Sequence, residues 1–210
     1  MYLKKKNILI SSLLICGLAF SGCSSKNEKV ENYTFSNDIS ELKLQNSSPT
    51  LIYTRPNAAP LSAYKNFIID PIKVKYNDPS VKKLDEKQIK KLQEYFHKSI
   101  VTKLKDGGYN ITNNPQLANT MKMSFILSGI KAPNPAANVV SVLAPIAPSV
   151  GSVTVEASFT DTNKNQVNAV VVNKSQGSRI LNTTPWSTWA DIESSFDQWS
   201  EGIVKSISSK

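Results

Sequence analysis

Within residues 150–162, VGSVTVEASFTDT, apolar and polar side chains alternate from Val153 to Thr160. The turn sequence NKN follows at 163–165, and QVNAVVVNK at 166–174 has the composition of a second strand. The pattern therefore predicts an antiparallel hairpin with one apolar face. It leaves open which of Val170 and Val171 faces the core.

Two other segments have the three-and-four spacing of apolar residues that is typical of an amphipathic helix. In residues 85–106, Asp85 is placed to cap the N-terminus, and two glycines follow the last turn. In residues 188–207 the apolar stripe is unusually rich in aromatic side chains, Trp189 among them. We expect both helices to pack on one face of a sheet.

Three further segments predict strands, at 66–76, 109–112 and 120–130. Pro71 interrupts the first of them, and since proline lacks an N–H group this segment is expected at a sheet edge or a bulge. Together the patterns predict an α+β fold. We expect an antiparallel sheet of about four to five strands with the two long helices packed on one face.

The chain begins with the order of an export signal, in which basic residues precede an apolar run and then small residues. The apolar run, ILISSLLICGLAF, has 13 residues, whereas a membrane-spanning helix needs about 20. A permanent transmembrane helix is the alternative. The end of the run, Phe20-Ser21-Gly22-Cys23, resembles the bacterial lipoprotein box. That resemblance implies cleavage between Gly22 and Cys23 and lipid, including palmitate, on Cys23.

These features divide the chain into a lipoprotein signal peptide at 1–22, a lipidated N-terminus and flexible tether at 23–50, and a periplasmic α+β domain at 51–210. The tether is rich in serine and asparagine, although apolar residues such as Phe35 can order where they meet a surface. Ser24 implies, by the same resemblance, transport to the outer membrane, with the domain facing the periplasm.

The composition argues against a disulfide-stabilised domain and against a nucleic-acid-binding protein. Both cysteines lie in the first 23 residues, so no disulfide holds the domain together. The net charge is +9 for the whole chain, and without residues 1–22 it is +6, from 22 basic and 16 acidic side chains. Only two residues are arginine, and no basic and aromatic pattern predicts nucleic-acid binding.

The chain has little of what catalysis needs. His97 is the only histidine, and it lies in the first predicted helix. A zinc site needs several His, Cys or carboxylate ligands. Asp70 and Glu156 are the carboxylates on which a hydrolase would depend. We expect no enzyme activity, no metal and no cofactor other than the covalent lipid on Cys23.

Residues 132–155 carry no charge, and four prolines bracket the apolar stretch AANVVSVLA. Asn134 can cap a short helix there. The segment either covers the sheet or contacts a partner. The candidate contact residues are the apolar side chains of this segment together with two tryptophans near the last helix: Val139, Val140, Val142, Leu143, Trp186 and Trp189.

The run AANVVSVLAP…VEASFTDTNKNQV, followed by a Trp-containing helix, resembles the bacterial lipoproteins catalogued as domain of unknown function 3313. The resemblance extends from about residue 50 to residue 207, and Gly151, Glu156 and Asp161 match its most recognisable positions. It implies a periplasmic α+β domain on a lipid tether, with no established activity.

The sequence therefore favours a membrane-anchored lipoprotein of the cell envelope that acts as a non-catalytic binding or assembly module. Its partners would be the membrane, through the anchor, and another envelope protein or polymer. The alternatives are a periplasmic hydrolase and an accessory subunit of an export system. The oligomeric state is left open.

Overall fold

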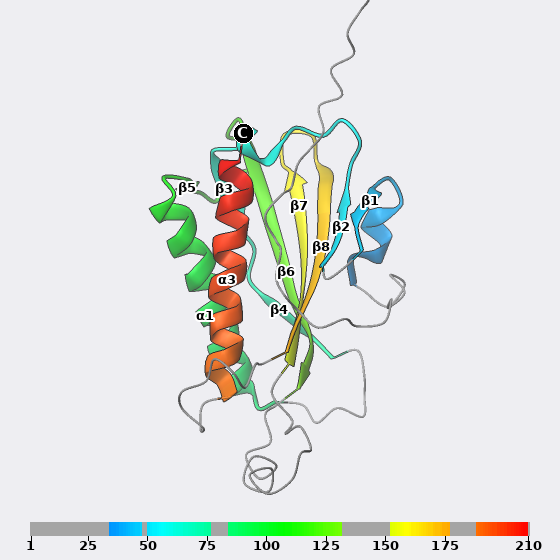
Figure 1. Cartoon of the computed structure of the whole chain (residues 1–210). Coiled ribbons are helices and arrows are strands. Elements are labelled where there is room, and N and C mark those ends of the chain that lie inside the picture. The colour runs from blue at the N-terminus through cyan, green and yellow to red at the C-terminus, as the bar shows by residue number, and fades with distance from the viewer. Residues whose placement is uncertain (1–33, 48–49, 77–83, 132–151, 177–187, 210) are drawn as a thin grey trace, which may run out of the picture.

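The computed structural model describes residues 34–47, 50–76, 84–131, 152–176 and 188–209. Figure 1 shows two long helices on one side of a twisted sheet. The elements, in chain order, are η2 (Thr34–Ile39), β1 (Lys43–Asn46), β2 (Thr50–Thr54), η3 (Leu61–Ala63), β3 (Asn66–Ile69), β4 (Lys73–Lys75), α1 (Glu86–Asp106), β5 (Asn110–Ile111), β6 (Thr120–Lys131), β7 (Ser152–Asp161), β8 (Gln166–Gln176) and α3 (Thr188–Ser208), of which η2 and η3 are 3-10 helices.

The α+β class and the two helices are confirmed, but the expectation of four to five antiparallel strands is wrong. The sheet has eight strands in the order β1-β2-β8-β7-β6-β3-β5, and β4 also pairs with β6. The part from β1 to β6 is antiparallel, whereas β3 and β4 run parallel to β6, and β3 runs parallel to β5. The parallel part arises because α1 carries the chain back across the sheet between β4 and β5.

The interruption at Pro71 divides the predicted 66–76 strand into β3 and β4. Both pieces pair with β6, at residues 120–123 and 126–128 respectively. Of these two pieces, β3 lies between β6 and the two-residue strand β5, whereas β4 has no second neighbour among the described strands.

Helix α1 begins and ends where its sequence predicts. The Asp85 carboxylate accepts a hydrogen bond from the Gln88 N–H at 2.8 Å, which satisfies an N-terminal donor. The apolar stripe packs inward and includes Phe96 and Ile100, which have no exposed surface. The Gly107 N–H donates to the carbonyl of Lys103 at the C-terminal end.

The aromatic stripe of α3 packs into the core. Phe196 is fully buried and stacks on Phe96 of α1, with 4.5 Å between ring centroids and 20° between ring planes. Phe96 also meets Phe125 of β6 edge to face, at 5.3 Å. The helices are therefore joined to each other and to the sheet by one aromatic cluster, which accounts for their shared face.

A line of polar contacts borders this cluster between the two helices. Asp197 of α3 accepts hydrogen bonds from Tyr95 at 2.9 Å and from Ser99 at 2.7 Å. Burial, followed by the neighbouring Asp197, raises the pKa of Tyr95 to about 12. One turn earlier, burial and then Asp197 raise the pKa of Glu193, while Lys91 of α1 lowers it. Two acidic side chains of α3, Glu193 and Asp197, therefore both lie against polar or charged groups of α1.

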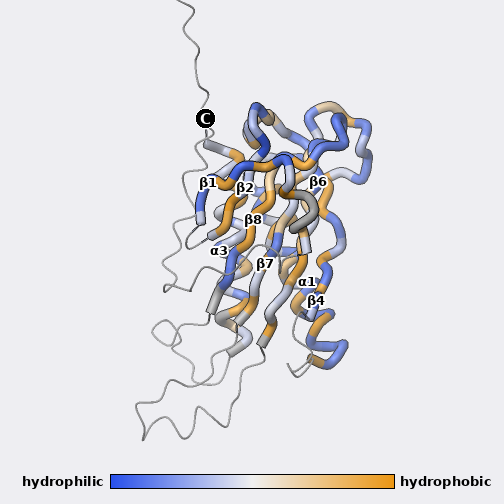
Figure 2. Tube along the Cα trace, turned by 90° about the vertical axis from the view of Figure 1, so that its right-hand side faces the viewer, coloured by the Kyte–Doolittle hydropathy of each residue, from blue (hydrophilic) through white to orange (hydrophobic). Residues whose placement is uncertain are grey.

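The β7–β8 hairpin is confirmed, with its turn at the predicted place. In Figure 2 part of the β8 tube is orange, in keeping with its run of three valines. Val171 lies opposite Ala157, which in turn lies opposite Phe125, and these residues face the helices. Val170 is on the other face and is also buried, with 2% exposure. Both faces of β8 are therefore covered.

The predicted flexible tether at 23–50 requires correction in its second half. Within it, η2 contacts β7 and β8, and β1 pairs with β2. Figure 1 shows η2 on the side of the sheet away from α1 and α3. The domain therefore begins at or before Thr34. Among the described residues, no helix is long and apolar enough to cross a membrane.

Candidate functional site

Glu156, one of the two carboxylates of the hydrolase hypothesis, lies on the face of β7 that is turned away from the helices. Its side chain has no exposed surface. One oxygen accepts a hydrogen bond from the Ser128 hydroxyl at 2.7 Å, and the other accepts from the Thr34 N–H at 2.6 Å. Both of these donors are neutral groups. Glu156 therefore fastens the start of η2 to the sheet.

Asp70, the second carboxylate, lies between β3 and β4. It accepts a hydrogen bond from the Ser124 hydroxyl at 2.5 Å, and its N–H donates to the carbonyl of Met123. Glu156 approaches β6 from the β7 side and bonds Ser128, which is four residues from Ser124 and hence about 13 Å along the strand. Paired glycosidase carboxylates lie about 5–10 Å apart. The structure does not join these two carboxylates in one hydrogen-bonded site.

His97 is half-buried on α1. Within the described ranges, no three His, Cys, Asp or Glu side chains are grouped so that they could hold a metal ion. The histidine therefore gains no ligand partners from the fold in the part of the chain that can be described.

Most of the predicted lipid and partner residues lie outside the described residues. Trp189 is the exception, and it is half-buried and packs against the core from the first turn of α3. The residues outside the described ranges are Gly22, Cys23, Val139, Val140, Val142, Leu143 and Trp186. Their roles remain predictions.

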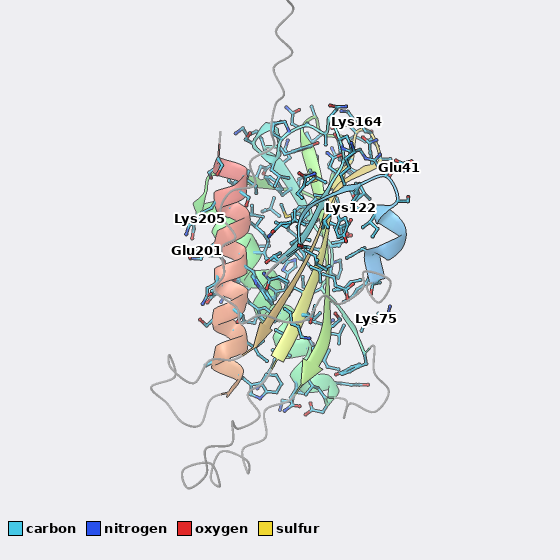
Figure 3. The ribbon with its side chains drawn as sticks, turned by 45° about the vertical axis from the view of Figure 1, so that its right-hand side comes forward. Glu41, Lys75, Lys122, Lys164, Glu201 and Lys205 are labelled. Carbon is cyan, nitrogen blue, oxygen red and sulfur yellow. The ribbon has the colours of Figure 1, made fainter. Side chains whose placement is uncertain are left out.

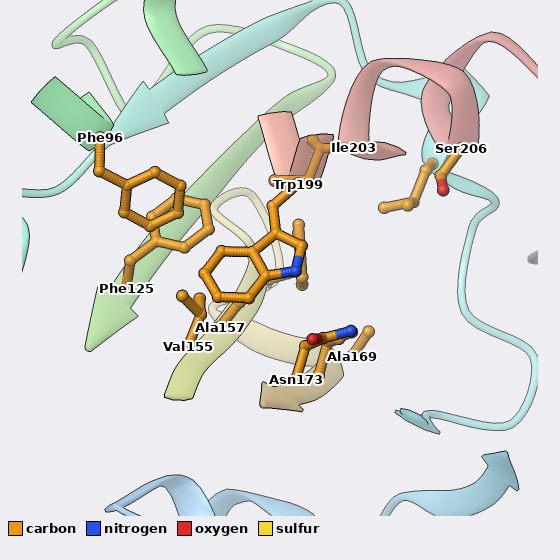
Figure 4. Close-up of a pocket in the computed structure, with 12 residues that line it drawn as sticks. Phe96, Phe125, Val155, Ala157, Ala169, Asn173, Trp199, Ile203 and Ser206 are labelled. Atoms are coloured by element: carbon orange, nitrogen blue, oxygen red, sulfur yellow. The ribbon is translucent and has the colours of Figure 1, made fainter. Parts of the chain in front are cut away.

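A narrow apolar cavity of about 50 Å³ lies between α3 and the sheet. Figure 4 shows the Trp199 indole across it, with Phe96 and Phe125 on one side and Ala169 and Asn173 on the other. Its volume is about a third of the 150 Å³ of an engineered cavity that holds benzene. We interpret this space as imperfect packing of α3 on the strands.

A second polar cluster surrounds Tyr64, which follows η3. The Tyr64 hydroxyl donates to Asp161 at 2.8 Å and accepts from the Asn168 amide at 2.9 Å. Burial, with the Asp161 carboxylate beside it, raises the pKa of Tyr64. The other Asp161 oxygen accepts hydrogen bonds from the N–H groups of Asn163 and Lys164 at the start of the hairpin turn. The cluster therefore fixes the hairpin turn to the core.

The feature that the sequence did not reveal is a polar hollow of about 370 Å³ beside this turn. One wall comes from the loop between η2 and β1 and from Arg55, and the other comes from the β7–β8 turn. Arg55 forms an ion pair with Glu41. The only sequence signal was that Arg55 is one of two arginines in the chain. The residues that line the polar hollow are Ser40, Glu41, Arg55, Lys164, Asn165, Gln166 and Val167.

Comparison with protein families gives one match. The family described as "Protein of unknown function (DUF3313)" matches residues 32–203. The matched region includes η2 and β1, in agreement with the earlier start of the domain. Among curated proteins, none matches the chain.

Solved structures with a similar course of the chain come from several bacterial proteins. A PelC dodecamer from Paraburkholderia phytofirmans is 10% identical, with a TM-score of 0.41, and the match covers 74% of this chain and 98% of that one. Protein XCC0632 from Xanthomonas campestris is 11% identical, with a TM-score of 0.43 and coverage of 71% and 86%. Lipoprotein GNA1162 from Neisseria meningitidis is 9% identical, with a TM-score of 0.34 and coverage of 65% and 96%. At these values the similarities carry no inference about function.

Proposed function

Because the chain belongs to the DUF3313 family of proteins of unknown function, we propose that it is a lipid-anchored lipoprotein of the cell envelope and a non-catalytic binding or assembly module. The anchor is Cys23, exposed as the first residue when the chain is cut after Gly22. Stable anchoring needs two or more acyl chains, which the lipoprotein pathway supplies. Ser24 favours the outer membrane, with the domain facing the periplasm.

The observation that supports this proposal is the bond between Thr34 and Glu156, since it fastens the chain to the sheet only a short stretch of sequence after the predicted anchor at Cys23. Ten residues, 24–33, separate Cys23 from Thr34. They span at most about 40 Å when fully extended. A tether of this length keeps the domain near the membrane surface and raises its effective concentration toward partners there.

Asp70 and Glu156 support a non-catalytic role by what they bind. Each hydrogen-bonds a serine of β6, from opposite sides of that strand. A general acid must instead reach a substrate within hydrogen-bonding distance. The periplasmic hydrolase stays the alternative, and the Asp70→Asn variant tests it. Retention of the envelope phenotype by a folded Asp70→Asn protein argues against Asp70 as the catalytic acid, and its loss supports that role.

Crosslinking in intact cells tests the binding role. A photoreactive residue at Val140 or Leu143 should yield a discrete product with an envelope protein or polymer. The same group at Lys98, which is exposed on α1, serves as the control. Identical products from all three positions would contradict a specific contact at the apolar segment. Recovery of an export-channel component would favour the accessory-subunit alternative.

A further inference from the structure

The guanidinium of Arg55 is held rigidly and is only partly used. Its Nε–H donates to the carbonyl of Val167 at 2.8 Å, and its backbone N–H donates to the carbonyl of Asn168 at 2.8 Å. Nη1 pairs with Glu41. An arginine has five N–H donors, so three of them have no acceptor among the described residues. The side chain is 16% exposed, and Arg55 lines the polar hollow.

The opposite wall of the hollow adds a second cation on a fixed turn. Figure 3 shows Lys164 and Glu41 at the same end of the molecule. The Lys164 backbone is anchored by Asp161, which accepts its N–H at 3.1 Å. Its ammonium group forms no ion pair within the described part of the chain. Asp161 itself is buried and fully engaged with Tyr64 and the turn.

The ion pair with Glu41 indicates that the chemical group that Arg55 binds is a carboxylate. The side chain of Glu41 is 69% exposed, in contrast to that of Arg55. Because most of the Glu41 side chain already faces solvent, it needs little rearrangement to leave Arg55, and an incoming carboxylate can take its place. The planar guanidinium matches a carboxylate with two parallel hydrogen bonds.

The rest of the lining favours a sugar. The volume of about 370 Å³ is at the lower end of the range for small-molecule sites, about 300–1,000 Å³. Ser40, Asn165 and Gln166 supply hydroxyl and amide groups that donate and accept hydrogen bonds. Hydroxyl groups on a sugar ring require partners of both kinds.

We propose that the polar hollow binds an acidic sugar residue of an envelope polysaccharide, with the carboxylate of the sugar replacing that of Glu41 on Arg55. Lys164 adds a second positive charge, and the neutral side chains contact the hydroxyls. The inference rests on the proposed binding role and assigns it a ligand class. In the bound state Glu41 turns to solvent.

Titration calorimetry on the full-length lipidated chain in mild detergent tests this assignment. The probe is trigalacturonate, and its methyl ester is the matched neutral sugar. We expect the ester to bind at least 10-fold more weakly than the acid. Arg55→Gln should weaken trigalacturonate binding at least 10-fold, and Lys164→Gln, at an exposed turn position, should weaken it several-fold without loss of fold.

Glu41→Gln is the most informative variant, because it removes the internal competitor. It should bind trigalacturonate several-fold more tightly than the wild type. Glu86→Gln, which removes an exposed acid at the start of α1, should leave binding unchanged. An equal gain in both variants would show general electrostatics and overturn the proposal, as would equal binding of acid and ester. Acetate binding as tight as that of trigalacturonate would also overturn the sugar assignment.

Fatty-acid labelling and membrane retention of the same protein preparations separate this inference from the proposed function. If the wild-type protein is labelled and retained in membranes but does not bind trigalacturonate, the sugar site is contradicted and the anchor is not. Absence of labelling contradicts the anchor, whatever the sugar result.

Discussion

The backbone N–H of Thr34 donates a hydrogen bond to the Glu156 carboxylate at 2.6 Å, although the two residues are 122 positions apart. The acceptor is fully buried on the middle strand β7, and its second oxygen accepts from Ser128 of the neighbouring strand. The first described turn of the chain is therefore held to the centre of the sheet and not to its edge.

Replacement of Glu156 by glutamine should loosen this attachment. The amide keeps the shape of the side chain but places a donor against one of two hydrogen-bond donors. We expect the free energy of unfolding to fall by about 1–3 kcal/mol. The rate of hydrogen exchange at the Thr34 amide should rise more than the rates at the amides of β7. Ser128→Ala, which removes only one of the two bonds, is the milder control. Unchanged exchange at Thr34 would contradict this role.

Adjacent valines on β8 provide a matched test of the cavity below α3. Val171 lines the cavity, whereas Val170 is buried on the opposite face, where it lines none of that space. Val171→Ile should leave stability unchanged or raise it by up to about 0.8 kcal/mol, since the added methylene fills empty space. Val170→Ile should lower it by about 1–3 kcal/mol through overpacking. Equal effects on the midpoint of urea unfolding would contradict this difference.

The Tyr64 hydroxyl should matter more than that of Tyr53. Tyr64→Phe removes the donor to Asp161 and the acceptor for Asn168, and leaves a buried carboxylate with one oxygen unpaired. We expect a loss of about 1–3 kcal/mol. Tyr53→Phe removes a half-buried hydroxyl that has no hydrogen-bond partner among the described residues. It should change stability by less than about 0.5 kcal/mol. Thermal unfolding compares the two variants.

Glu193 should make the fold less stable as the pH rises. Burial and then Asp197 raise its pKa above the ordinary 4.5 in the folded protein. The folded state therefore binds this proton more tightly, and its contribution is present below about pH 4.5 and lost as pH rises through the folded-state pKa. Glu193→Gln should raise the melting temperature at pH 7 and leave it nearly unchanged at pH 4. In an Asp197→Asn background the gain should shrink.

The elements that the sequence predicts correctly depend on local patterns. Helix α1 has its cap at Asp85 and its apolar stripe within 22 consecutive residues. The β7–β8 hairpin pairs neighbours in the chain across a short turn. Each signal is complete within its own segment, so periodicity alone identifies the element.

The errors concern pairing over long distances. β1 and β2 are four- and five-residue strands whose place depends on β8, more than 100 residues later. The parallel pairing of β3 with β6 depends on how α1 crosses the sheet. The sequence offers Glu156 only as a carboxylate of a possible hydrolase, and its partner Thr34 lies within the predicted tether. The polar hollow at Arg55 has no local sequence pattern, because its walls come from three separate segments of the chain.

The anchor at Cys23 is the claim on which the proposed function depends, and one measurement tests it directly. Cells expressing the wild type or Cys23→Ser are labelled with radioactive palmitate, and the membrane and soluble fractions are compared. Cys16→Ser, in the apolar run, is the matched control. We predict that only Cys23→Ser loses the label and releases the domain from membranes. Full labelling and membrane retention of the Cys23→Ser protein would contradict the account.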